Sequence, residues 1–125
     1  MMDYKKLLLT AITLVVVDMG FLYLMGPYFG KMVKSIQGSD MVLNNLTAFI
    51  TYVILVLQIY YFIISKNASY TDAFILGSTT YAIFDFTNLS VFKNYNINIA
   101  LVDSIWGGIL YMLVTFIFRQ VERKI

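Results

Sequence analysis

The sequence predicts an all-α protein: a four-helix transmembrane bundle with up-down-up-down topology and both termini on the same side. Three observations lead to this fold class. Of the 125 residues, 60% are hydrophobic and only 13% are charged, whereas soluble domains carry about 25% charged residues. The hydrophobic residues gather in four long stretches without the period-2 alternation of an outer-membrane barrel. With one Pro, seven Gly and no linker-like tract, residues 1–125 are expected to form a single transmembrane domain.

The predicted helices cover about residues 7–29, 43–64, 71–92 and 97–118. Each has about 22 residues, or about 33 Å of helix, which matches a bilayer core of about 30 Å. The first apolar run is too long for a signal-peptide core, so we expect a retained helix. The short connections "SKNASY" and "KNYNIN" favour antiparallel neighbours. The longer connection at 30–42 alternates polar and apolar residues, which predicts a short amphipathic piece on the outer membrane surface.

The distribution of basic residues predicts the orientation. Six of the nine Lys and Arg residues fall on the side of the termini and three on the other side, so the positive-inside rule places the N- and C-termini in the cytoplasm. The first group is Lys5, Lys6, Lys66, Arg119, Arg123 and Lys124, and the second is Lys31, Lys34 and Lys93. Tyrosines near the helix ends are suited to anchoring at the membrane interface. They are Tyr4, Tyr28, Tyr70 and Tyr95.

Composition also limits the chemistry. The chain has no Cys and no His, which excludes disulfides, zinc and haem sites built on these ligands, and thiol or imidazole catalysis. We expect no metal site and no cofactor. The net charge of +2 is small, and the basic residues are scattered around apolar segments, so nucleic-acid binding is not expected. The expected partners are the lipid bilayer and further copies of the chain.

Three carboxyl groups fall inside the hydrophobic stretches. Asp18 is at the middle of the first, and Asp85 and Asp103 lie about 6 Å from the midplane on antiparallel helices, at nearly the same depth. A charged residue at the bilayer centre costs about 2.5–3.5 kcal/mol and usually faces the bundle interior. We therefore expect the three side chains to converge. Because no Lys or Arg lies in the core, they are either protonated or hold a cation, and functional sites exploit both states.

Other polar side chains continue along helix faces. The third stretch carries Ser78, Tyr81, Asp85 and Asn88 on one face. The second stretch carries Asn44, Thr47, Thr51 and Gln58, which we interpret mainly as hydrogen-bonding groups between helices. Trp106 and Gly107 lie one turn from Asp103, so the indole N–H can reach inward and the glycine allows a neighbouring helix to approach closely.

The segments "FDFTNL", with Lys93 after it, and "VDSIWGG" resemble the paired signature of an uncharacterised membrane-protein family, domain of unknown function 2177. The resemblance spans essentially the whole chain, including "GPYFGK" from Gly26. It implies four transmembrane helices but no assigned activity. Position by position it implicates Asp18, Asp85, Thr87, Asn88, Asp103, Trp106 and Gly107. The chain departs from the family where Tyr23 and Tyr95 stand in place of Trp.

Three functions fit these residues. The first is binding or transport of a small solute, a proton or a cation, with a homo-oligomer forming the pathway because four helices enclose little volume. Its binding residues would be Asp85, Asn88, Asp103, Trp106, Asp18, Thr87 and Tyr81, with Gly107 structural. The second is an intramembrane enzyme that acts on a lipid or isoprenoid with an Asp pair as acid and base; the missing nucleophile motifs argue against an enzyme. The third is a non-catalytic interaction subunit.

Overall fold

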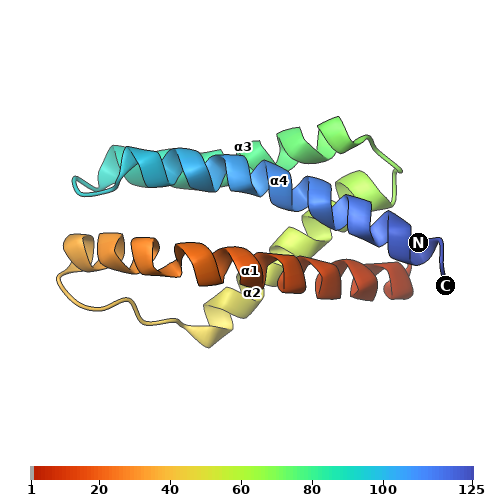
Figure 1. Ribbon diagram of the computed structural model, residues 1–125, viewed down its shortest axis with the longest axis horizontal. Helices are drawn as coiled ribbons and strands as arrows, with labels where there is room; N and C mark the ends of the chain where they lie inside the picture. The colour runs from red at the N-terminus through yellow and green to blue at the C-terminus, as the bar shows by residue number, and fades with distance from the viewer. Residues whose placement is uncertain (1) are drawn as a thin grey trace.

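The structure is a computed structural model that describes residues 2–125, which form four α-helices and contain no β-strand. The elements are α1 (Tyr4–Gln37), α2 (Asn45–Ile59) with its π-helical continuation η1 (Tyr60–Ile64), α3 (Tyr70–Val91) and α4 (Ile97–Glu122). The chain runs along the bundle four times in alternating directions, so the two termini lie at the same end (Figure 1). The predicted all-α, up-down-up-down bundle is confirmed.

The helices differ in how well they suit a membrane. Within residues 2–125, α1, α2 together with η1, and α4 are long and apolar enough to cross a bilayer. The 22 residues of α3 give about 33 Å of helix, which is also sufficient length. Ser, Thr, Asn and Asp recur along α3, however, and make it more polar. This helix packs most extensively against α4.

The first helix is longer than predicted, which corrects the expected connection at 30–42. It continues through Pro27 and ends before Gly38, whose left-handed backbone (φ 78°) terminates it. Proline is tolerated in membrane helices because neighbouring groups compensate for the lost backbone hydrogen bond. The additional turns bury Met32, with Ile36 one turn later, against the start of α4. The expected amphipathic surface piece is therefore the end of α1 itself.

The other helices begin at residues whose side chains cap them. Asn44 accepts a hydrogen bond from the backbone of Thr47 at the start of α2 (3.1 Å). Ser69 and Asp72 form a capping box at the start of α3, and Asn96 caps α4. Such caps satisfy backbone N–H groups that have no partner in the first helical turn. They set the length of the connections, and with it the depth of each side chain.

Glycines bring α3 and α4 into backbone contact. A Cβ atom added to Gly77 would lie 2.1 Å from the carbonyl oxygen of Gly107, and one added to Gly107 would lie 2.4 Å from the Cγ atom of Tyr81. Close helix approach through small residues is a usual packing mode in membranes. The contact fixes the depth at which side chains of α3 and α4 face each other.

Two apolar clusters fill the bundle, and the buried aspartates lie between them. The larger cluster is nearer the termini and includes Leu14, Ile59 and Val114; the smaller consists mainly of Met32, Tyr95 and Ala100, near the opposite end. In each of α1, α3 and α4, the residues of one cluster precede the aspartate in the sequence and the residues of the other cluster follow it. The polar layer therefore lies between two apolar clusters along the bundle.

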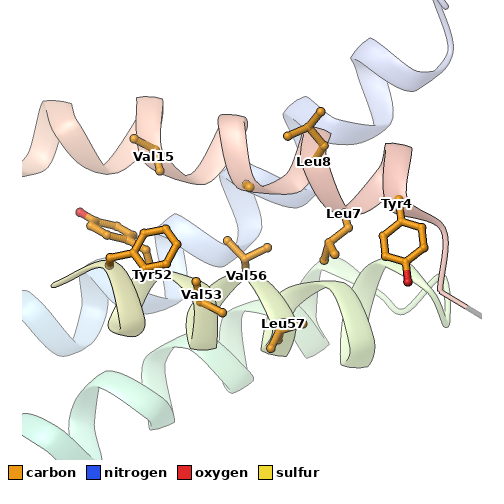
Figure 2. A pocket seen from close by; sticks show the side chains of 10 residues that line it. Tyr4, Leu7, Leu8, Val15, Tyr52, Val53, Val56 and Leu57 are labelled. Atoms are coloured by element: carbon orange, nitrogen blue, oxygen red, sulfur yellow. The ribbon is translucent and has the colours of Figure 1, made fainter. Parts of the chain in front are cut away.

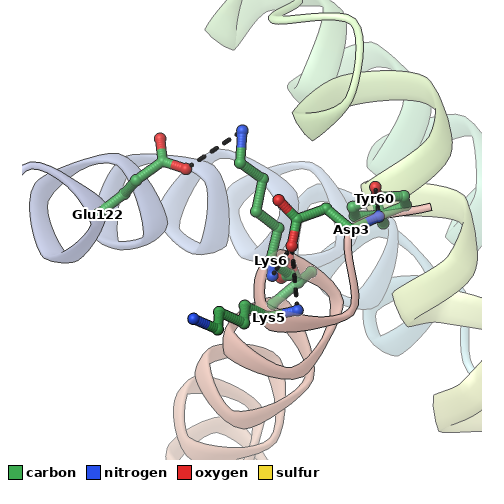
Figure 3. Close-up of polar contacts among 6 residues, drawn as sticks. Asp3, Lys5, Lys6, Tyr60 and Glu122 are labelled. Atoms are coloured by element: carbon green, nitrogen blue, oxygen red, sulfur yellow. Dashed lines mark hydrogen bonds and ion pairs between the residues drawn. The ribbon is translucent and has the colours of Figure 1, made fainter. Parts of the chain in front are cut away.

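The end of the bundle that carries the termini is tied by polar contacts. The backbone N–H of Asp3 donates to the hydroxyl of Tyr60 (2.8 Å), and Lys6 pairs with Glu122 of α4 at 3.4 Å (Figure 3). Asp3 also caps α1 by accepting from the backbone N–H of Lys5 (3.1 Å). These contacts hold the start of α1 against η1 and the end of α4.

Candidate functional site

Asp18 connects three helices. Its Oδ2 atom accepts a hydrogen bond from the Tyr52 hydroxyl of α2 (2.6 Å), and its Oδ1 atom accepts one from the indole N–H of Trp106 on α4 (3.1 Å). The ring of Phe21 stacks on Trp106, with 4.5 Å between centroids and 2° between planes. Both oxygens of this buried carboxyl are thus satisfied by neutral donors, as expected for a group that holds helices together.

Asp85 and Asp103 form a second site, between α3 and α4. Asp85 is completely buried, with 0% of its surface exposed, and Asp103 is 7% exposed. The two side chains are close enough to interact directly. The Oδ1 atom of Asp85 accepts from the Tyr95 hydroxyl (2.8 Å). Its Oδ2 atom has no hydrogen-bond partner and is the single such buried side-chain N or O atom within residues 2–125.

Tyr95 reaches this site from the connection between α3 and α4. It was expected to anchor at the membrane interface, but it is only 9% exposed and points into the bundle, so that expectation is wrong for this tyrosine. Burial, followed by the hydrogen bond to Asp85, raises the pKa of the Tyr95 phenol above its usual value, so the hydroxyl remains a donor. Asn88, one turn after Asp85, neighbours the same hydroxyl.

The two carboxyl sites are neighbours but do not merge. Tyr81 is near both Asp18 and Asp103. Asp103 is likewise within electrostatic range of Asp18. Trp106, one turn from Asp103, donates to Asp18, so Asp18 is bound by an indole rather than by the other acids. In the described part of the chain no group of three or more acids, His or Cys is placed to hold a metal ion.

No basic side chain neutralises this layer. The ion pairs within residues 2–125 join Lys6 to Glu122 and Lys34 to Asp40, each at 3.4 Å. The first lies at the end of the bundle that carries the termini, and the second near the turn between α1 and α2. The donors that reach the aspartates are instead the neutral groups of two tyrosines and one tryptophan.

Gln58 forms a separate polar contact on the terminal side of the layer. Its amide N–H donates to the Thr80 hydroxyl of α3 (2.9 Å), and its carbonyl oxygen accepts from the Tyr111 hydroxyl of α4. Thr47 and Thr51, on the same predicted stripe, are exposed and donate to carbonyls of their own segment. Among these stripe residues in the described part of the chain, Gln58 is thus the one whose side chain bonds to another helix.

Two residues that the family resemblance singled out fall elsewhere. Thr87 is exposed on the outer face of α3, away from the buried acids, and Tyr23 is 85% exposed. Tyr52 was not singled out from the sequence, although it donates to Asp18. A single tyrosine in an apolar helix gives no periodic signal, and its partner is 34 residues away along the chain.

The fold and this layer define an integral membrane protein whose helices enclose buried carboxyl groups. The chain belongs to the family described as predicted membrane protein (DUF2177), which matches residues 4–118. The family resemblance found in the sequence is confirmed. Searches of the curated proteins and of the solved structures gave no match.

Proposed function

We propose that the Asp85–Asp103 pair binds a proton or a small cation, and that the protein transports it. The observation that carries this proposal is the unpartnered Oδ2 atom of Asp85, fully buried beside a second carboxyl. Two ionised carboxylates this close repel each other, and burial penalises both. One positive charge placed between them removes the repulsion and leaves a single negative charge to bury. A proton on Asp103 does this directly, because its O–H can donate to the free oxygen of Asp85.

Asp18 has a different role in this proposal. Its two oxygens already accept from Tyr52 and Trp106, so it offers no free atom to a ligand. It holds α1, α2 and α4 together beside the pair. The interpretation of the acids as purely structural groups thus fits Asp18 better than Asp85.

The second sequence-based candidate, an enzyme acting on a lipid, has less support. An apolar hollow lies between α1 and α2 (Figure 2), and neither Asp85 nor Asp103 lines it. A lipid bound there would not reach the carboxyl pair with its reacting atoms. General acid–base catalysis requires the catalytic carboxyl within hydrogen-bond reach of the substrate.

The proposal extends to orientation and assembly. Both termini lie at one end of the bundle (Figure 1), and six of the nine basic residues belong to that end or to the connection before α3. The positive-inside rule assigns this end to the cytoplasm. Because four helices enclose little volume, we assign the pathway past the pair to an assembly of several copies.

Proton flux into liposomes tests the proposal. Asp103→Asn supplies an amide N–H that can donate to the Oδ2 atom of Asp85, so the fold is kept while the exchangeable proton is removed. We expect proton uptake, driven by a potassium diffusion potential and followed with an internal pH dye, to fall to the level of empty liposomes. The same assay with a sodium gradient distinguishes a proton from a sodium ion.

Asp40→Asn is the matched control, because its side chain is 83% exposed and lies outside the layer. It should retain wild-type flux. A folded Asp103→Asn protein with wild-type flux would contradict the proposal. So would wild-type liposomes that pass neither protons nor sodium ions faster than empty liposomes do.

A further inference from the structure

The acid pair lies close to one end of the α3–α4 hairpin. Asp85 lies about 9 Å of helix before the end of α3 at Val91, and Asp103 lies about 9 Å after the start of α4 at Ile97. In the other direction, α3 continues from Asp85 to Tyr70 over about 22 Å. On α3, the pair is therefore much closer to the α3–α4 connection than to the end of the bundle that carries the termini (Figure 1).

Toward the end with the termini, α3 and α4 are in backbone contact next to the pair. Gly107 lies one turn from Asp103 in that direction, and a Cβ atom added to it would be 2.6 Å from the carbonyl oxygen of Gly77. The following turn of α4 carries Leu110 and Tyr111, which are both completely buried. The interface between α3 and α4 therefore offers an ion no passage in this direction.

Tyr95 joins the pair to the opposite end of the bundle. It belongs to the α3–α4 connection, and its hydroxyl donates to the Oδ1 atom of Asp85 (2.8 Å). Its neighbours in the connection, Asn94 and Asn96, are exposed. Asn88, near the end of α3, neighbours the same hydroxyl. One side chain thus reaches from the exposed connection to a carboxyl that is itself completely buried.

The backbone of the connection fixes the position of Tyr95. The N–H of Tyr95 donates to the carbonyl oxygen of Phe92 (3.2 Å). The next residue, Asn96, donates from its backbone N–H to the sulfur of Met32 on α1 (3.3 Å) and caps α4 with its side chain. Contacts on both sides of Tyr95 thus direct its hydroxyl to Asp85.

A tyrosine hydroxyl can pass on a proton without a net change of its own charge, because it is both a donor and an acceptor. When its proton moves to the Oδ1 atom of Asp85, its oxygen takes another proton from water at the connection, and the O–H bond is restored. A metal cation would instead have to displace the hydroxyl from Asp85. The contact therefore favours protons over metal cations.

We propose that the acid pair exchanges protons with the side of the membrane opposite the termini, and that Tyr95 is the group through which they pass. This inference rests on the proposed function and narrows it, because it assigns the proton as the ion and the α3–α4 connection as its entrance. Under the positive-inside assignment, this entrance faces away from the cytoplasm.

Cysteine substitutions on either side of the pair test the proposal, since the chain has no Cys of its own. Tyr95→Cys places a thiol at the connection, and Thr80→Cys places one on α3 on the other side of Asp85. Each variant is reconstituted into liposomes that are sorted by the side on which a C-terminal tag is exposed. A cationic methanethiosulfonate that does not cross membranes is then added outside, and proton uptake is measured.

Tyr95→Cys leaves room for water beside Asp85, so part of the flux should remain before the reagent is added. Reagent on the side of the connection should reduce this flux to the level of empty liposomes, because a fixed cation beside Asp85 takes the place of the proton. Thr80→Cys should be inhibited more slowly from the side of the termini. Asn94→Cys is the matched control, because it is exposed beside Tyr95 and should keep its flux when labelled.

Asn88→Cys keeps the tyrosine and neighbours its hydroxyl, so it should respond as Tyr95→Cys does. The inference is overturned if Thr80→Cys is inhibited as fast from the side of the termini as these two variants are from the other side. Wild-type liposomes that carry sodium ions but no protons would also overturn it and leave the proposed function standing. Wild-type liposomes that pass neither ion would remove both.

Discussion

The two halves of the bundle pack in opposite ways. In the α3–α4 half, Gly77 and Gly107 bring the backbones together, and the two facing carboxyls are shut in. In the α1–α2 half, large aliphatic side chains face each other across a hollow of about 490 Å³, and a hydrogen bond joins Tyr52 to Asp18. A buried acid pair needs walls that exclude water, which glycine contacts provide. An open apolar hollow needs helices that stay apart.

The largest expected effect comes from disrupting the close contact between α3 and α4. Gly107→Val places a side chain against the Tyr81 ring and the carbonyl of Gly77, where a Cβ atom alone would lie 2.4 Å from the ring. We expect a loss of about 3 kcal/mol or more in the free energy of unfolding, the upper range for overpacking. Unfolding by SDS, followed by circular dichroism, measures it.

Gly20→Val is the control for this change, since no atom lies within 4 Å of a Cβ atom added at Gly20. It should leave stability within about 0.5 kcal/mol of wild type, as surface substitutions usually do. If both variants lose equal stability, the backbone contact between α3 and α4 is not what holds that half together.

A smaller effect is expected from removing the carboxyl group that connects α1 with α2 and α4. Asp18→Ala leaves the hydroxyl of Tyr52 and the indole N–H of Trp106 without their acceptor. Each unpaired buried donor costs about 1–3 kcal/mol, and relaxation at the hollow reduces the sum, so we expect a loss of about 2 kcal/mol. The emission of the single Trp should also change, because the indole loses its carboxylate partner.

Hydrogen exchange localises the Asp18→Ala effect. Amides of α2 should exchange faster, while those of α3 and α4 should keep wild-type protection. Equal acceleration in all four helices would show that the two halves unfold as one unit and would remove the distinction drawn between them.

The smallest expected effect comes from removing the hydrogen bond that Tyr95 donates to Asp85. Tyr95→Phe removes the donor to the Oδ1 atom of Asp85 and leaves the ring in place among Met32 and Ala100. We expect a loss of about 1 kcal/mol in stability and reduced proton flux, because the Oδ1 atom of Asp85 loses its hydrogen bond. Tyr28→Phe, at an exposed tyrosine, should change neither quantity. Unchanged flux in Tyr95→Phe would remove this tyrosine from the proposed site.

Hydropathy predicted the bundle because a chain segment in lipid must satisfy its own backbone hydrogen bonds, which a helix does, and must be long enough to cross the membrane. The proximity of Asp85 and Asp103 also followed, since helix rise and antiparallel order bring them to the same level of the bundle. The extension of α1 past Pro27 did not follow, because it depends on contacts of Met32 with the start of α4. The separation of Asp18 from the acid pair depends on which face α1 turns toward Trp106, and one sequence does not specify that rotation.

The burial of Tyr95 is another feature that the sequence did not predict. Its position near a helix end is typical of interfacial tyrosines, and only the fold of the short α3–α4 connection turns it inward. The hollow between α1 and α2 was equally inaccessible to sequence reasoning. It arises from how two helices diverge, and apolar residues that line a hollow look the same in sequence as those that face lipid.

The glycine contact also determines which parts of the molecule can move. Sliding or rotating α3 against α4 would drive the ring of Tyr81 or Tyr111 into a backbone that already touches its neighbour. A conformational change of the bundle would therefore leave this hairpin rigid and take place in segments outside it, such as the connection from Gly38 to Asn44.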